Sequence, residues 1–256
     1  MRIATWNVNS LNARLSRVEE WLEYAAPDIV CLQETKVADS AFPAMALSAL
    51  GYESVAHGDG RWNGVAILSK VGVDGVRTGF GNEMDEQGCR LVAATCSGIR
   101  VHSVYVPNGR SLESEHYVAK LQWLGALQRY LADTCTPAQD IVVAGDFNVA
   151  PDDRDVWDPA AVNGATHVSE PERAGVRALE SWGLVDAFRL HYEQGALYSW
   201  WDYRAGNFHK HMGMRIDLVL LSDSLARRSR FALIDRNARK GRQPSDHAPV
   251  FVDLHD

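Results

Sequence analysis

The stretch Ile141-Val142-Val143-Ala144-Gly145-Asp146-Phe147-Asn148 decides how this chain folds. Its first half is a short continuous apolar run, which is typical of a strand buried on both faces. Its second half is polar, and a segment rich in Asp, Pro, Asn and Gly follows from Pro151 to Glu170. The stretch therefore predicts a central strand with polar side chains at its end.

On both sides of this strand, short apolar runs alternate with segments of helical periodicity. The further predicted strands are 2–8, 28–33, 52–57, 64–70, 90–96, 100–105, 215–221, 230–235 and 247–254. The predicted helices are 11 to just before Pro27, 42–50, 114–132, and one that ends near Trp182. Strands that pair antiparallel and also alternate with helices favour an α/β or α+β sandwich, with the sheets inside. No linker, repeat or low-complexity segment interrupts the pattern, so we expect one domain over residues 1–256.

The composition is that of an ordinary globular protein. The chain has 256 residues, 46% of them hydrophobic and 23% charged, and a formal net charge of −7, which argues against disorder. No apolar run approaches the ~20 residues of a membrane span, and the N-terminus enters a strand pattern without a signal peptide. The four cysteines are scattered, which is typical of reduced thiols. We therefore expect a cytoplasmic protein without a membrane partner.

Positive charge is concentrated in one region. Residues 204–242 hold ten Lys and Arg against three Asp, within a chain that is acidic overall. Such a region could dock a polyanion, because only the facing surface needs to be positive. It could equally be a solvated face without a partner, and charge alone leaves both interpretations open.

Polar side chains recur at or next to the ends of the predicted strands. They are Asn7, Glu34, Tyr105, Asn108, Asp146, Asn148, Asp217, Asp246 and His247. Each one alone has a structural explanation, such as a helix cap, a turn or a half-buried ring. Together they are poorly explained in that way, and strand ends are rigid mounts for a site.

The chemistry of this set narrows its function. The carboxylates of Glu34, Asp146 and Asp246, with the amide oxygens of Asn7 and Asn148, suit Mg²⁺ or Mn²⁺ better than zinc. His247 offers an imidazole, and Asp217 is a candidate to fix its tautomer and keep it charged. A divalent ion, a carboxylate base and an oriented histidine suit in-line attack of water on phosphorus. No phosphate-binding glycine loop is present, so nucleoside triphosphate chemistry is not indicated.

Several motifs resemble a known family. They are Leu32-Gln33-Glu34-Thr35-Lys36, Gly145-Asp146-Phe147-Asn148-Val149-Ala150, Arg215-Ile216-Asp217, Ser245-Asp246-His247-Ala248-Pro249, Trp62-Asn63-Gly64-Val65-Ala66-Ile67, Tyr105-Val106-Pro107-Asn108-Gly109 and Ser199-Trp200-Trp201-Asp202-Tyr203. Together they resemble the exonuclease III type of abasic-site endonuclease, in the endonuclease/exonuclease/phosphatase superfamily. The resemblance runs from Arg2 to Leu254.

The resemblance implies a four-layer αββα sandwich, in which two packed mixed sheets are flanked by helices. It also implies Mg²⁺-dependent cleavage on the 5′ side of an abasic nucleotide in duplex DNA. Related members act as 3′→5′ exonucleases and as 3′-phosphatases or 3′-phosphodiesterases. The expected partner is double-stranded DNA with abasic sites or 3′ ends, bound by a monomer.

The resemblance also suggests roles. Glu34 matches the principal metal ligand, and Asn7 and Asp246 match residues around the ion. Asp146 matches the group that orients or deprotonates water, and Asn148 helps to hold that group and the phosphate. Tyr105 matches the tyrosine beside the scissile phosphate, and His247 with Asp217 matches the phosphate-binding histidine. One or two metal ions, and Asp146 or His247 as the base, stay open. An imidazolium beside two carboxylates favours Asp146 as the base.

Substrate contacts are expected in the aromatic and basic segment that follows. By resemblance, Trp200, Met214 and Ile216 would line the pocket for a flipped-out sugar. Lys210, Arg204 and the arginines of 236–242, among them Arg239, are candidate phosphate contacts, and Asn108 is a further DNA contact. The sequence departs from the family pattern where Cys89 separates Gly88 from Arg90, and in the loop 152–170.

Two other functions fit parts of the pattern. The first keeps the fold and the metal but acts on inositol phosphates, a phospholipid or RNA. The second is a DNA-binding relative without catalysis, which the complete set of competent side chains disfavours.

Overall fold

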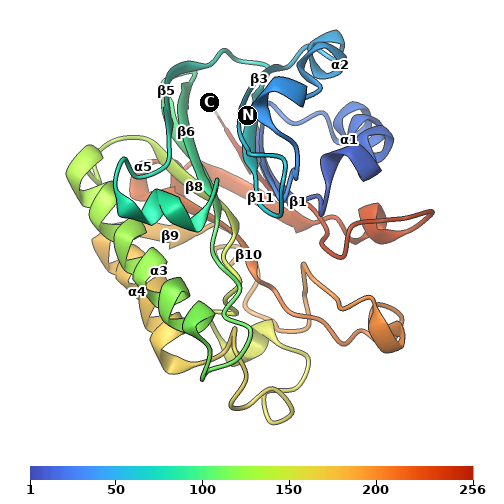
Figure 1. The fold of residues 1–256 in the computed structure, drawn as a ribbon, viewed down its shortest axis with the longest axis vertical. Helices are drawn as coiled ribbons and strands as arrows, with labels where there is room; N and C mark the ends of the chain where they lie inside the picture. Colours follow the sequence, from blue (N-terminus) through green and yellow to red (C-terminus); the bar gives the residue numbers. More distant parts are fainter. Residues whose placement is uncertain (256) are drawn as a thin grey trace.

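The computed structural model describes residues 1–255, which form two six-stranded sheets packed face to face (Figure 1). The first sheet has the order β11-β12-β1-β2-β4-β3 and the second β5-β6-β7-β8-β10-β9. The strands are β1 (Arg2–Asn7), β2 (Ile29–Gln33), β3 (Glu53–His57), β4 (Val65–Ser69), β5 (Asp74–Thr78), β6 (Leu91–Cys96), β7 (Ile99–Tyr105), β8 (Ile141–Asp146), β9 (Leu184–Asp186), β10 (Asp217–Ser222), β11 (Ser229–Ile234) and β12 (Val250–Leu254).

Each sheet has one parallel pair near its centre. These pairs are β1 with β2 and β7 with β8, and the other neighbouring strands are antiparallel. A parallel pair needs a crossover connection, which α1 (Leu11–Ala25) and α3 (Glu115–Thr134) supply. The carboxyl ends of the paired strands therefore lie side by side at one edge of each sheet.

The helices cover the two outer faces of the sheets. Val18 and Leu22 of α1, with Leu47 of α2 (Ala44–Ala49), pack on the first sheet, and Leu127 of α3 and Val176 of α4 (Glu170–Trp182) pack on the second. Between the sheets lies a third apolar core, to which both contribute. The result is the predicted αββα sandwich, with α3 and α4 on one side and α1 and α2 on the other (Figure 1). Within residues 1–255, no helix has the length and apolarity that crossing a membrane requires.

The predicted elements differ from the observed ones at several places. The edge strand β5 has no buried residue, and β9 has only three residues, so neither gives a clear apolar signal. The strand expected at 247–254 begins only at Val250. Before it, Asp246 accepts a hydrogen bond from Trp201 N, and Ala248 N donates one to Ser199 O. Backbone hydrogen bonds to residues 199–201 therefore take the place of strand pairing before Val250. The short helix α5 (Asp223–Ala226) was not predicted.

A buried ion pair joins the two helices on the second sheet. Lys120 of α3 and Glu172 of α4 are both fully buried, and Lys120 Nζ donates to Glu172 Oε1. Glu172 also accepts from Thr166 Oγ1 at 2.8 Å and from the N–H of Ser169 at 3.0 Å. Ser169 caps α4 in return, because the N–H of Glu172 points to its hydroxyl. The pair therefore connects α3, α4 and the loop before α4.

The carboxyl group of Glu172 should make stability depend on pH in acid. Burial raises its pKa, but Lys120 and the surrounding donors outweigh burial and lower the pKa from 4.5 to about 2. Because the folded-state pKa is the lower one, this contribution to the free energy of unfolding is present above pH 4.5 and is lost as the pH falls toward 2. We expect Glu172→Gln to lower the free energy of unfolding by about 3 kcal/mol at pH 7.

Urea unfolding of the wild type and Glu172→Gln between pH 7 and pH 2.5 measures this effect. The difference between the two proteins should shrink as the pH falls from about 4.5. A difference that stays constant over this range would contradict the assignment.

Candidate active site

Side chains from both sheets converge where the central strands end. In the second sheet, Tyr105 and Asp217 are the direct register partners of Asp146 on the neighbouring strands. In the first sheet, Asn7 ends β1 and pairs with Gln33, the residue before Glu34. Strand register therefore fixes the positions of these side chains before any loop contributes.

A cluster of one imidazole and two carboxylates forms at this point. Glu34, Asp146 and His247 each offer a ligand atom, and these atoms lie within 4.8 Å of one another. The amide Nδ2 of Asn7 donates to Glu34 Oε1 at 2.9 Å and to Asp146 Oδ2 at 2.9 Å. The hydroxyl of Tyr105 donates to the same Glu34 oxygen at 2.9 Å. The structure thus brings five of the predicted residues together.

His247 lies between two carboxylates. Its Nδ1 donates to Asp217 Oδ2 at 2.9 Å, and its Nε2 lies 3.8 Å from Asp146 Oδ2. Burial lowers the pKa of His247, but Asp217 and Asp146 outweigh it and raise the pKa from 6.5 to about 10. Burial raises the pKa of Asp146 to about 7, and the charge on His247 opposes this shift. At neutral pH the imidazole is therefore charged.

Asn148 holds Asp146 from the other side. Its N–H donates to Asp146 Oδ1 at 2.8 Å, and its side-chain Nδ2 donates to Val106 O at 3.0 Å. Its Oδ1 accepts from Asn108 Nδ2 at 3.2 Å, so Asn108, a predicted DNA contact, adjoins the cluster. Asn148 has a φ of 50°, in the left-handed region that asparagine tolerates better than most residues.

Three predicted metal ligands are placed differently from the expectation. The Oδ1 of Asn148 accepts from Asn108 Nδ2 at 3.2 Å, and its Nδ2 donates to Val106 O and Asp146 Oδ2. Asp246 is outside the cluster, since its oxygens accept from Asn9 Nδ2 at 3.0 Å and from Trp200 Nε1 at 3.1 Å. Asn7 presents its Nδ2, not its oxygen, to the carboxylates, because its Oδ1 accepts from the N–H of Asn9 at 3.0 Å. In this arrangement Asp246 bonds to residues beside the cluster, and Asn7 donates hydrogen bonds to the carboxylates of the cluster.

The donor set of the cluster fits a hard divalent cation. An imidazolium has no free lone pair, so charged His247 is a poor ligand, and the oxygens of Glu34 and Asp146 are left as donors. Lys36 Nζ lies 2.9 Å from Glu34 Oε2, which shows that this oxygen is within reach of a cation. Such oxygen ligands suit Mg²⁺ or Mn²⁺.

The three residues expected to line a sugar pocket are neighbours. Trp200, Met214 and Ile216 belong to one small apolar cluster with Ala150 and Val156. Met214 is 8% exposed and Ile216 is 2% exposed, so only the partly buried Trp200 opens to solvent. The structure brings the three together, but it shows a nearly closed cluster.

One predicted phosphate contact is not at the surface. Arg239 is 6% exposed, its Nη1 donates to Ser245 O, and its guanidinium packs over Tyr203 and Phe208. These contacts hold the guanidinium of Arg239 inside the protein, and a phosphate contact at this residue stays a prediction. Arg204 is exposed and paired with Asp202, and Lys210 is exposed.

Several residues at the site were not singled out from the sequence. Lys36 binds Glu34, and Asn9 binds Asp246 and accepts from Lys36 Nζ at 2.7 Å. Both lie within two residues of a predicted ligand, so spacing alone could have indicated them. Arg90 lies 4.6 Å from the ring centroid of Tyr105, and His167 Nδ1 lies 2.5 Å from Asn148 O. These two come from distant segments. The sequence marked Arg90 and the loop of His167 only as departures from the family pattern.

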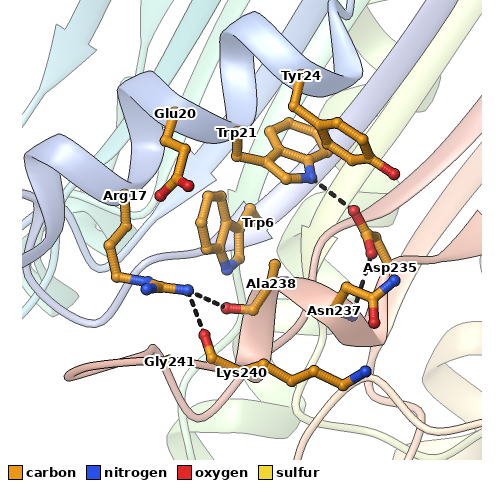
Figure 2. Close-up of a pocket in the computed structure, with 10 residues that line it drawn as sticks. All are labelled: Trp6, Arg17, Glu20, Trp21, Tyr24, Asp235, Asn237, Ala238, Lys240 and Gly241. Atoms are coloured by element: carbon orange, nitrogen blue, oxygen red, sulfur yellow. Dashed lines mark hydrogen bonds between the residues drawn. The ribbon is translucent and has the colours of Figure 1, made fainter.

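A cavity lies next to Trp6, a neighbour of His247. It has a volume of about 420 Å³ and is lined by Trp6, Trp21, Arg17 and Lys240, among others (Figure 2). Trp6 Nε1 donates to His247 O at 3.2 Å, so this indole separates the cavity from the backbone of His247. Arg17 reaches across to the carbonyls of Ala238 and Lys240 (Figure 2).

Comparison with known proteins yields a consistent set of relatives. Residues 4–247 match the Endonuclease/Exonuclease/phosphatase family. Exodeoxyribonuclease III of Haemophilus influenzae is 33% identical, over 99% of this chain and 100% of that protein. An AP endonuclease from Archaeoglobus fulgidus has a TM-score of 0.96 and 37% identity, with 99% of each chain covered. The 3′ phosphatase NExo from Neisseria, bound to a product DNA hairpin, has a TM-score of 0.96 and 39% identity, covering 100% of this chain and 99% of that one.

Removing the negative charge of Asp217 tests the electrostatics of His247. We expect Asp217→Asn to lower the pKa of His247 from about 10, because burial is then opposed by Asp146 and weaker charges only. The measurement is an NMR titration of the histidine ring in buffer without divalent ions. A His247 that titrates at the same pH in both proteins would rule out Asp217 as the main cause.

Proposed function

Because the chain belongs to the Endonuclease/Exonuclease/phosphatase family, and is similar to exodeoxyribonuclease III over nearly its full length, we propose that it is a DNA-repair nuclease. It hydrolyses phosphodiester bonds, incising duplex DNA 5′ to abasic sites and processing 3′ ends as an exonuclease and phosphatase. The observation that carries this proposal is the buried cluster of Glu34, Asp146 and charged His247 at the ends of both sheets.

The side chains of the cluster divide the work of hydrolysis. Asp146 accepts the proton of the attacking water. Asn7 and Asn148 hold its carboxylate in place, and the charged His247 cannot act as the base because it already carries its proton. His247 donates a charged hydrogen bond to a phosphate oxygen, with Asp217 fixing its ring. Burial raises the pKa of Tyr105 well above 10, so its neutral hydroxyl serves as a donor beside the phosphate.

We propose that Glu34 and Asp146 hold the divalent ion, which we take to be Mg²⁺, with Mn²⁺ as a substitute. A bound ion of this kind would neutralise charge on the phosphate as it is attacked. Asn7 and Asp246 act in this proposal through hydrogen bonds around the ion.

Double-stranded DNA is the proposed substrate, and exposed groups around the cluster suit it. Trp62 is 78% exposed on a loop that accepts bonds from the N–H groups of Thr35 and Lys36, beside Glu34. Its indole is free to stack on a base, and exposed Lys210 is free to contact phosphate. The Neisseria relative is bound to a DNA hairpin. We further propose a monomer that acts in the cytoplasm, where its four free thiols stay reduced.

A second candidate is an enzyme restricted to 3′ ends. A flipped-out sugar needs an open pocket, whereas Met214 and Ile216 are almost fully buried and the ring of His167 lies 6.4 Å from that of Trp200. A terminal phosphate needs no such pocket. This closed cluster favours 3′-end processing over internal incision.

Cleavage assays on defined substrates test the proposal. The substrates are a duplex with one internal abasic analogue, a duplex with a 3′-phosphate and an inositol polyphosphate. We expect hydrolysis of DNA that EDTA abolishes and Mg²⁺ restores, and no turnover of the inositol compound. Release of 3′-phosphate without incision would favour the second candidate. Turnover of the inositol compound alone would refute a DNA nuclease.

Removal of the proposed machinery should separate binding from turnover. We expect Glu34→Ala and Asp146→Asn to bind duplex DNA nearly as well as the wild type and to lower turnover by about a thousandfold or more. Binding is measured by fluorescence anisotropy and turnover under single-turnover conditions. Wild-type turnover in either variant would refute the assigned role.

The salt dependence of DNA binding tests whether Lys210 contacts a DNA phosphate. We expect Lys210→Ala to reduce the slope of log K against log salt by about one unit. Arg227→Ala is the control, because Arg227 follows the opposite end of β10 and pairs with Asp223. Equal slopes for wild type and Lys210→Ala would place Lys210 away from phosphate.

A further inference from the structure

Two side chains, one fully buried and one half-buried, contact the same backbone carbonyl near the cluster. The carbonyl oxygen of Asn148 accepts from Lys120 Nζ at 2.6 Å and lies 2.5 Å from His167 Nδ1. Lys120 comes from α3 and His167 from the loop before α4. A carbonyl that lies just after a strand could be satisfied by water or a neighbouring N–H. Here the protein instead uses a fully buried lysine.

A buried lysine requires a compensating group, and Glu172 supplies it. Breaking such a pair leaves one charge buried without a partner, which costs several kcal/mol. Both oxygens of Glu172 are fully used, one by Lys120, Thr166 and the N–H of His167, the other by the N–H and hydroxyl of Ser169. The orientation of Lys120 Nζ is therefore fixed by several bonds at once.

The same carbonyl belongs to a residue whose conformation matters. Asn148 has a φ of 50°, and its N–H and its side-chain amide both point to Asp146. Rotation about the backbone of Asn148 would move its carbonyl, its N–H and its side chain together. A bond that holds the carbonyl thus also sets the two donors that meet the proposed base.

We propose that the Lys120–Glu172 pair is a positioning device for the reaction, which acts through Asn148 to aim its N–H and amide at Asp146. This inference rests on the proposed function, since it assigns Asp146 a part in hydrolysis. Lys120 is a positioning residue and does not touch the substrate. The pair also ties α3 to α4, and the experiment separates these two effects.

The experiment is a double-mutant cycle with Lys120→Met and Asn148→Gly. Glycine removes the side-chain amide and adopts the left-handed conformation without strain. Turnover of a 3′-phosphate duplex and an abasic duplex is measured at a temperature at which every variant is folded by circular dichroism. Leu124→Ala is the matched control, because Leu124 packs in the same core between α3 and α4 but contacts neither Asn148 nor Glu172 through a polar group.

We expect Lys120→Met to lower kcat by about ten- to hundredfold with little change in KM, because misplaced groups slow the chemical step. The Asn148→Gly background lacks the side-chain amide but keeps the N–H. There the same substitution should lower kcat by a smaller factor than in the wild type, since coupled residues are not additive. Leu124→Ala should lower Tm and leave kcat unchanged. An equal effect of Lys120→Met in both backgrounds, or none in either, would overturn the inference.

Glu172→Gln carries the same test if Lys120→Met does not fold. It keeps the shape of the side chain and an acceptor oxygen but removes the charge, and it should lower kcat in the wild-type background only. Failure of the proposed function is distinguishable from failure of this inference. The first would leave the wild type itself without activity on both duplexes, and the second would appear only in the variants.

Discussion

The site depends on one amide that joins the two sheets. Asn7 ends a strand of the first sheet, and its Nδ2 donates to Glu34, after β2, and to Asp146, at the end of β8 in the second sheet. The carboxylates of Glu34 and Asp146 share this one donor, so their negative charges repel each other, and burial also disfavours the charged form of a carboxyl group. The surrounding donors, Tyr105, Lys36 and His247, are arranged to offset this cost. Without them, the ends of the sheets would not hold negative charge.

The same balance explains why a histidine lies inside the protein in its charged form. His247 has a carboxylate on each side, so charges alternate from Asp217 through the imidazolium to Asp146. The proton on Nδ1 is held by Asp217, and Nε2 faces the cluster. A ring fixed in this way needs no reorganisation when a phosphate oxygen approaches. Donors that are oriented in advance in this manner are usually the largest electrostatic contribution to enzyme catalysis.

Much of this arrangement could be predicted from the sequence, for a physical reason. Buried runs such as 141–145 define strands, so Tyr105 and Asp146 could be predicted to lie at strand ends. Only the structure shows that β7 and β8 are parallel neighbours, which makes the two residues register partners. The exposed strand β5 has no such signal. Lys120 was not predicted, because its partner Glu172 lies 52 residues away on another helix and only packing brings the two together. For Arg239, composition indicated a surface charge, but aromatic rings and a carbonyl hold it inside.

The residues proposed for hydrolysis and those proposed for substrate choice lie on different kinds of structural element. The groups proposed to act on phosphorus lie on or directly after central strands, where strand register and buried bonds leave little freedom. The groups proposed to meet DNA lie on loops, at Trp62 and around Lys210. Loops tolerate change in length and sequence more readily than strands. A fixed hydrolytic centre can therefore serve internal sites or 3′ ends according to whether the loop residues near Trp200 leave space. In this proposal, the packing of Met214 and His167 beside Trp200 would decide between these substrates, and the carboxylates would not.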